Sequence, residues 1–173
     1  MCISPSHTEM DSVDYYNGIS ESYESLYRRE QIGKMKRLLD IVKPEDSQRI
    51  LDIGAGTGIL EEMLPGFRIT AVEPSILAAN ILDKRMTNVK LVRSRIEDFE
   101  TDKRFDIVFC ITVLQDLPPE ERQRTMEKMF RFCKKGGKVV ISVLKASDID
   151  LSDMNPEESG EVENDKFYIF ETS

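Results

Sequence analysis

The fold of this chain is decided by the stretch Ile50-Leu-Asp-Ile-Gly-Ala-Gly-Thr-Gly-Ile59. A short apolar strand runs straight into three glycines at alternate positions, Gly54, Gly56 and Gly58, and a helical pattern follows. Alternating glycines allow a tight turn and let a ligand lie against bare backbone, while the first amides of the next helix point outward. The spacing therefore predicts a ligand site where the first strand ends.

Two kinds of nucleotide site fit this loop poorly. A P-loop has Gly-Lys followed by Ser or Thr, whereas Gly58 is followed by Ile59 and Leu60. A dinucleotide loop starting at Gly54 would carry its third glycine at the position of Ile59. The P-loop is excluded, and an NAD-dependent oxidoreductase remains a less favoured alternative.

Outward from this loop, apolar segments typical of strands alternate with helical patterns. The first helical stripe, Ile32–Val42, ends before Pro44, and Ser75 is expected to cap a later helix. This alternation requires crossover connections and predicts a doubly wound, mostly parallel sheet with helices on both faces and ligands at the carboxyl ends of the strands. The expected strands are Arg49–Ile53, Phe67–Glu73, Val89–Arg93, Phe105–Thr112, Lys138–Leu144 and Lys166–Glu171, and the further helices are Ile59–Leu64, Ile76–Arg85 and Pro119–Cys133.

Size and composition favour a single globular domain over residues 1–173. The chain has 173 residues, of which 40% are apolar and 32% charged. The longest apolar run, Ile107 to Leu114, is too short for a membrane span, and residues 1–10 lack the basic and apolar regions of a secretion signal. We expect a cytoplasmic protein that does not contact a membrane.

The formal charge of -8 is concentrated near the C-terminal end. Nine acidic and two basic side chains lie in residues 145–173, which leaves the rest of the chain nearly neutral. We expect an acidic loop at residues 145–165 and a last strand at residues 166–171. A nearly neutral body leaves nucleic acid open as a partner.

The sequence contains few of the cysteine and histidine residues that metal binding or imidazole catalysis requires. The cysteines Cys2, Cys110 and Cys133 form no Cys-x-x-Cys pair, and the single histidine, His7, lies in a polar terminal stretch. We expect reduced thiols, two of them in the core, and neither a disulfide nor a metal site.

Two acids accompany the glycine loop. Asp52 precedes the glycines, where a buried carboxylate needs a cation or hydrogen-bond donors, so a cationic ligand would suit it. Glu73 ends the second expected strand, where a carboxylate can accept two hydrogen bonds from ribose hydroxyls. The pattern indicates a ribose without a pyrophosphate.

Four motifs of this chain, taken in sequence order, resemble those of class I S-adenosylmethionine-dependent methyltransferases. They span residues 49–144, the expected cofactor-binding core. The resemblance implies strand order 3-2-1-4-5 with a last antiparallel strand, three α/β/α layers, S-adenosyl-L-methionine as cofactor, and methyl transfer as the activity. The motifs are the glycine stretch already quoted, Thr70-Ala-Val-Glu-Pro-Ser75, Phe105-Asp-Ile-Val-Phe-Cys-Ile-Thr-Val-Leu114 and Lys134-Lys-Gly-Gly-Lys-Val-Val-Ile141.

The resemblance also implies where the cofactor lies. Asp52 and the glycine loop would surround its methionine end, Glu73 its ribose, and Ile96 and Glu97 its adenine, while Ile111 to Leu114 would line the pocket near the methyl group. The implied cofactor-binding set is Asp52, Gly54, Ala55, Gly56, Gly58, Glu73, Pro74, Arg95, Ile96, Glu97, Ile111, Tyr16 and Tyr23.

Arg95 departs from the family pattern, because relatives commonly place an acid there to accept the adenine amino group. Arginine cannot accept a hydrogen bond. Either Glu97 or Asp98 takes that role, or the backbone and stacking read adenine, or the cofactor binds more weakly. Arg95 as an ordinary surface residue is an equal alternative.

Residues 1–43 are expected to form a helical cap or lid that carries four of the five tyrosines. One interpretation is an amphipathic helix that packs Tyr15, Tyr16, Tyr23 and Tyr27 on the edge of the sheet. The other, implied by the resemblance, is a lid in which Tyr16 or Tyr23 contacts the cofactor carboxylate.

A methyl group on a sulfonium is already activated, so positioning and desolvation can carry much of the catalysis without a dedicated base. The weak catalytic candidates are Gln115, Asp116 and Tyr23, and Asp116 is also explained as a helix cap. The Asn/Asp-Pro-Pro-Tyr/Phe motif of amide and exocyclic-amine methyltransferases is missing, which disfavours adenine, cytosine and glutamine nitrogens as acceptors.

Few residues follow the fifth strand, so we expect no complete C-terminal hairpin and an open acceptor side. An open side suits a macromolecule or a protein partner that completes the acceptor site, whereas a lid suits a small metabolite. The unidentified acceptor is therefore a small molecule, a protein or RNA. A non-catalytic subunit that binds S-adenosylmethionine, with a regulatory or partner role, remains the main alternative.

Overall fold

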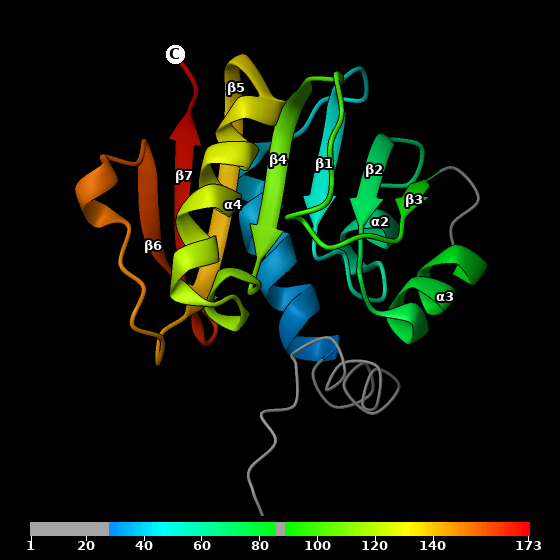
Figure 1. Cartoon of the computed structure of the whole chain (residues 1–173), viewed down its shortest axis with the longest axis horizontal. Coiled ribbons are helices and arrows are strands. Elements are labelled where there is room, and N and C mark those ends of the chain that lie inside the picture. The colour runs from blue at the N-terminus through cyan, green and yellow to red at the C-terminus, as the bar shows by residue number, and fades with distance from the viewer. Residues whose placement is uncertain (1–27, 86–88) are drawn as a thin grey trace, which may run out of the picture.

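The centre of the structure is a seven-stranded sheet with the order β3-β2-β1-β4-β5-β7-β6. This computed structural model describes residues 28–85 and 89–173 (Figure 1). Strands β1 to β5 pair in parallel, and β7 runs antiparallel to both β5 and β6. The predicted order and the antiparallel last strand are confirmed. The strands are β1 (Arg49–Ile53), β2 (Arg68–Val72), β3 (Lys90–Val92), β4 (Phe105–Ile111), β5 (Cys133–Leu144), β6 (Glu158–Val162) and β7 (Asp165–Glu171).

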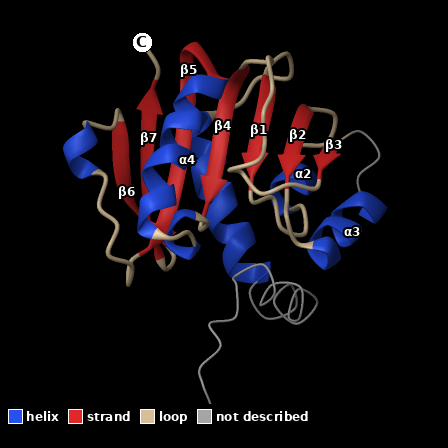
Figure 2. Cartoon of the chain, in the orientation of Figure 1, coloured by secondary structure: helices blue, strands red, loops and turns tan. Residues whose placement is uncertain are grey.

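Helices cover both faces of the sheet, as the strand and helix alternation predicts (Figure 2). A helix of residues 28–42 packs behind β1, β4 and β5 in this view, and α4 packs in front of β4 and β5. The Ser75 hydroxyl accepts a hydrogen bond from the Ala78 amide at 3.3 Å, which confirms the expected cap of α3. The labelled helices are α2 (Ile59–Met63), α3 (Ile76–Arg85) and α4 (Pro119–Phe132), with short turns η1 (Leu114–Asp116) and η2 (Ser152–Met154).

Alternate residues of β4 supply both halves of the core. Val108 and Cys110 pack with Met129 and other residues beneath α4. Phe109 packs on the opposite face in the cluster that includes Leu38 from the helix of residues 28–42. A strand buried on both faces needs this continuous apolar run, because each successive side chain enters a different half of the core.

The expected acidic loop at residues 145–165 is wrong in part, and so is the expectation of an incomplete hairpin. Residues Glu158–Val162 form β6, which pairs with β7 in the register Gly160↔Phe167 and Val162↔Asp165. Only Val162 of β6 is buried. An edge strand with one buried side chain lacks the apolar alternation by which a strand is recognised in sequence. Residues 158–162 form a strand because their backbone pairs with β7.

Within the two described ranges, no helix combines the length and the apolar character that crossing a lipid bilayer demands. Cys110 and Cys133 are free, buried thiols, as expected. Cys2, His7 and the four clustered tyrosines lie outside the described residues.

Candidate ligand pocket

A cavity of about 120 Å³, partly open to solvent, lies at the carboxyl ends of β1, β2 and β4. Neighbouring parallel strands leave a crevice at this edge when their crossover helices lie on opposite faces. The cavity is lined by Ile53, Gly54, Gly56, Thr57, Val72, Glu73, Pro74, Ser75, Ala78, Ser94, Arg95, Ile96, Glu97, Ile111, Thr112, Val113, Asp116 and Leu117.

The glycine loop forms one wall of the pocket. Its three glycines adopt backbone conformations that residues with a Cβ atom disfavour. Gly54, Gly56 and Gly58 have φ angles of 73°, 56° and 87°. A Cβ atom on Gly58 would lie 2.9 Å from Leu82 Cγ, so helix α3 can approach the loop only because that position is glycine. No neighbour lies within 4 Å of a Cβ built on Gly56, which leaves its backbone bare toward the pocket.

Glu73 connects the glycine loop to the start of α3. Its Oε2 accepts a hydrogen bond from the Gly56 amide at 2.7 Å, and its Oε1 accepts one from the Ser75 amide at 2.7 Å. Burial raises the pKa of Glu73, and the two amide hydrogen bonds oppose that rise. Each oxygen keeps an unused lone pair, so the carboxylate can hold the loop and still accept hydrogen bonds from a ligand.

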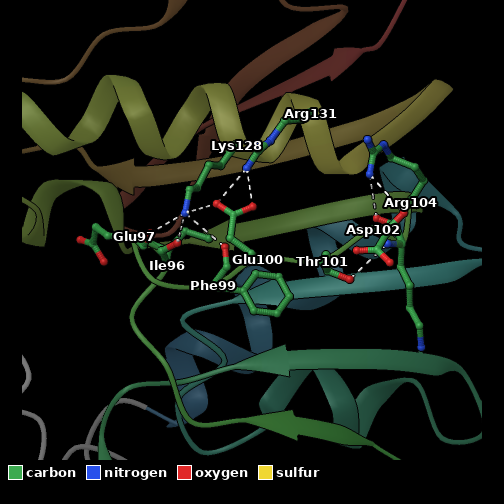
Figure 3. A network of polar contacts seen from close by, with 10 residues as sticks. Ile96, Glu97, Phe99, Glu100, Thr101, Asp102, Arg104, Lys128 and Arg131 are labelled. Carbon is green, nitrogen blue, oxygen red and sulfur yellow. Dashed lines mark hydrogen bonds and ion pairs between the residues drawn. The ribbon is translucent and has the colours of Figure 1, made fainter.

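Another wall of the pocket is the turn at residues 95–99, which a lysine on α4 holds in place. Lys128 donates its ammonium protons to the carbonyl oxygens of Ile96 at 3.1 Å and Phe99 at 3.2 Å, and also to that of Glu97. Its Nζ also lies 3.0 Å from Glu100 Oε1 (Figure 3). A single lysine therefore fixes the backbone of a pocket-lining turn that contains no regular secondary structure.

The carboxyl group of Glu97 is turned away from Lys128 in Figure 3. Both of its oxygens are buried, and neither receives a hydrogen bond from an N–H group or a hydroxyl group of the residues that the structure describes. A hydrogen bond between the Glu97 and Glu121 side chains is the main cause that raises the pKa of Glu121 on α4. A carboxylate can accept about four hydrogen bonds and the Glu121 carboxyl can supply one of them, so this part of the pocket suits a ligand with N–H groups.

A second acidic pair lies beneath the glycine loop, outside the pocket lining. Asp52 and Glu61 are 4% and 1% exposed. Burial is the largest cause that raises the pKa of Asp52 well above its usual range, and the neighbouring Glu61 raises it further. Burial also raises the pKa of Glu61 to about 7. The Asp52 carboxyl therefore lies beside the Glu61 carboxyl.

The structure brings most of the expected site residues together, although their roles stay predictions. Asp52, Ala55, Gly58 and Gln115 do not line the cavity, and Tyr16 and Tyr23 lie outside the described residues. The Gln115 side chain instead donates to the Thr112 carbonyl at 2.6 Å. The expected residues that line the cavity are Gly54, Gly56, Glu73, Pro74, Arg95, Ile96, Glu97, Ile111 and the catalytic candidate Asp116.

Sequence reasoning did not find Glu61, Lys128 or the role of Ser75. Ser75 could have been found, because its amide follows Glu73 closely enough to reach the carboxylate. Lys128 had no such signal, since 31 residues separate it from Glu97. Within the described ranges, no group of three or more His, Cys, Asp or Glu side chains could hold a metal ion.

This sheet order, glycine loop and pocket define the class I methyltransferase fold. The family model described as "Methyltransferase domain" matches residues 23–170. The chain therefore belongs to the methyltransferase domain family.

Individual relatives are more distant. The ubiquinone biosynthesis O-methyltransferase of Rickettsia bellii is 31% identical over 103 residues, which cover 55% of this chain and 41% of that protein. The match thus spans about two fifths of that curated relative.

Two solved structures share the fold at low sequence identity. The magnesium protoporphyrin IX methyltransferase of Synechocystis, crystallised with bound S-adenosylmethionine, has a TM-score of 0.76 at 14% identity, covering 92% of this chain and 94% of that one. A chain from the complex of the Haloferax volcanii Trm112 methyltransferase activator with a methyltransferase has a TM-score of 0.63 at 18% identity, covering 78% of this chain and 61% of that one.

Proposed function

We propose that this chain binds S-adenosylmethionine and transfers its methyl group to an acceptor. The observation that carries the proposal is the pocket at the carboxyl edge of the sheet, in which Glu73 braces a bare glycine loop. In the reaction, an acceptor lone pair attacks the methyl carbon as the carbon–sulfur bond breaks, which leaves neutral S-adenosylhomocysteine. The acceptor proton then passes to solvent or to a group of the pocket.

The pocket residues suit successive parts of the cofactor. Gly54 and Gly56 would lie against its methionine end, and the free lone pairs of Glu73 would accept hydrogen bonds from the ribose hydroxyls. The buried Glu97 carboxyl receives no hydrogen bond from an N–H group of the described residues, which supports Glu97 as the acceptor for the adenine amino group in place of the acid that Arg95 replaces. Arg95 itself lines the pocket and is half-buried, so it lies near the cofactor.

Catalysis then rests on alignment and exclusion of water. Asp116 is the described catalytic candidate that lines the pocket, and its backbone amide donates to the Val113 carbonyl at 3.0 Å. Its side chain is the group that could receive a proton from an acceptor. Gln115 supports the pocket wall through Thr112 rather than reaching the cavity.

The similarity to a ubiquinone biosynthesis O-methyltransferase favours a hydroxyl acceptor on a small molecule over protein or RNA. A protein partner that completes the acceptor site is a further proposal, supported by the fold neighbour found with a methyltransferase activator.

Calorimetry with S-adenosylmethionine, S-adenosylhomocysteine and NAD tests the proposal. We expect micromolar binding of the first two and none of NAD, and Glu73→Ala should weaken binding by roughly tenfold because a charged hydrogen-bond acceptor is lost. Glu62→Ala, on the exposed side of α2, is the matched control. Binding of NAD without S-adenosylmethionine would refute the assignment.

Turnover distinguishes the enzyme from a non-catalytic subunit. Methyl-labelled S-adenosylmethionine should label a component of a metabolite, protein or RNA extract in the presence of the wild-type chain. Binding without transfer to any extract would favour the subunit with a regulatory or partner role.

A further inference from the structure

A fully buried ion pair joins the helix of residues 28–42 to the last strand. The side chains of Lys34 and Asp165 are both 0% exposed, and 2.9 Å separates Lys34 Nζ from Asp165 Oδ2. Charged side chains are seldom buried this completely, because removing them from water is costly unless partners compensate. This pair therefore needs an explanation beyond the packing of the core.

Two hydroxyl groups complete the arrangement. Thr112 Oγ1 accepts a hydrogen bond from Lys34 Nζ at 2.8 Å and donates one to Asp165 Oδ2 at 2.7 Å. Ser142 Oγ donates to the same Asp165 oxygen at 2.6 Å. Asp165 Oδ1 has no partner among the described residues, so the contacts from Lys34, Thr112 and Ser142 to Asp165 converge on one oxygen, Oδ2.

Thr112 connects this arrangement to the pocket. It follows β4 directly, lines the cavity, and has a φ of 59°. A β-branched residue adopts this left-handed conformation only where its surroundings hold it there. The hydrogen bonds of the Thr112 hydroxyl with Lys34 and Asp165 restrain the side chain. The hydrogen bond from the Thr112 amide to the Ser142 carbonyl, at 2.9 Å, restrains the backbone.

The turn at Thr112 determines where Val113 lies. Val113 also lines the cavity, and its Cγ2 would be 2.3 Å from a Cβ atom built on Gly54. The side chain thus rests on the bare backbone of the glycine loop. A change in the Thr112 conformation would lift Val113 from Gly54 and open the wall at that end of the pocket.

The elements that carry the ion pair are also joined outside the core. Asn164 Nδ2 donates to Glu30 Oε2 at 3.1 Å, and a Cβ on Gly33 would meet Glu163 Oε1 at 2.8 Å. The turn between β6 and β7 therefore lies directly against the helix that carries Lys34.

We infer that Lys34 and Asp165 are positioning residues of the methyl-donor site. They hold Thr112 in its left-handed conformation, and Thr112 in turn places Val113 against Gly54 at the methionine end of the cofactor. Neither residue lines the pocket. The inference rests on the proposed function for the identity of the ligand, and it makes the β6–β7 hairpin a support of the site.

The test must separate positioning from simple stabilisation of the fold. Thr112→Val keeps the branched shape and removes the hydroxyl, whereas Thr112→Ser keeps the hydroxyl. The double variant Lys34→Met/Asp165→Leu removes both charges together, since apolar replacement of a buried ion pair often leaves stability unchanged. Val162→Ala is the control, because it weakens the same hairpin without reaching Thr112.

Each variant is titrated with S-adenosylhomocysteine and with 5′-methylthioadenosine, which lacks the amino-acid part, at a temperature where circular dichroism shows it folded. Thr112→Val and the double variant should lose roughly tenfold in affinity for S-adenosylhomocysteine but less than about twofold for methylthioadenosine. Thr112→Ser and Val162→Ala should retain both affinities. Equal losses for both ligands, or a loss in Val162→Ala as large as in the double variant, would overturn the inference.

Hydrogen exchange gives a readout that does not depend on the ligand. In the unliganded double variant, the amides of residues 112–117 should exchange roughly tenfold faster than in the wild type. Unchanged exchange overturns the positioning role. If the wild type binds neither adenosyl ligand, the proposed function fails, and the exchange measurement still decides whether Lys34 and Asp165 hold this turn.

Discussion

Val113 occupies the space that a side chain at Gly54 would need. A Cβ atom on Gly54 would lie 2.3 Å from Val113 Cγ2, far closer than van der Waals contact allows. The contact joins the end of β4 to the glycine loop and thereby closes one end of the pocket. Gly54 is thus required by its neighbour as well as by its φ of 73°.

Gly54→Ala should destabilise the protein by about 2–5 kcal/mol, the sum of a left-handed alanine and an overpacked contact. Gly66→Ala is the matched control: its φ is 88°, but nothing lies within 4 Å of the added Cβ. It should lose about 1–2 kcal/mol, from backbone strain alone. Urea denaturation measures both, and Val113→Ala should recover part of the loss in Gly54→Ala. Equal losses at the two glycines would show that the Val113 contact is unimportant.

The buried carboxyl of Glu61 should make stability depend on pH. Burial raises its pKa from 4.5 to about 7. The folded state therefore binds a proton that the unfolded state releases, so the contribution is fully present below pH 4.5 and is lost as pH rises through about 7.

Glu61→Gln should remove much of this slope, leaving the variant more stable than the wild type above pH 7 and similar to it near pH 4. Urea denaturation between pH 4 and pH 8 measures the effect. Glu62→Gln, at the exposed neighbour on α2, should keep the wild-type slope. Parallel curves for Glu61→Gln and the wild type would contradict the assignment of the slope to Glu61.

Lys128→Met should loosen the turn that lines the pocket. The methionine keeps the apolar stem but leaves three carbonyl oxygens without the ammonium donor. We expect a loss of about 1–3 kcal/mol in stability and a several-fold weaker affinity for adenosine-containing ligands. Arg131→Met is the control, since Arg131 also pairs with Glu100 at 2.8 Å but donates to none of these three carbonyl groups. Equal effects of the two substitutions on ligand affinity would show that the carbonyl contacts do not shape the pocket.

Local patterns made most of the parallel core predictable. β1 was expected at the residues where it lies, and α3 at Ile76–Arg85, because apolar runs and caps are local signals. β5 begins at Cys133 rather than Lys138, since its first residues owe their strand conformation to pairing. The Gly136 amide, for example, donates to the carbonyl oxygen of Thr172 at the far end of the chain. β6 was missed for the same reason, whereas the last strand, β7, was expected almost where it lies.

The sequence by itself determined the glycine loop, the strand order implied by its motifs, and the expectation that Glu73 faces a ligand. These follow from short-range spacing, because a strand, a turn and a helix start are contiguous in the chain. Only the tertiary structure decided that Lys34 and Asp165 meet beside Thr112, and that Lys128 reaches the turn at Ile96. Such partners are far apart in sequence, and no local pattern encodes which buried charge finds which partner once the layers pack.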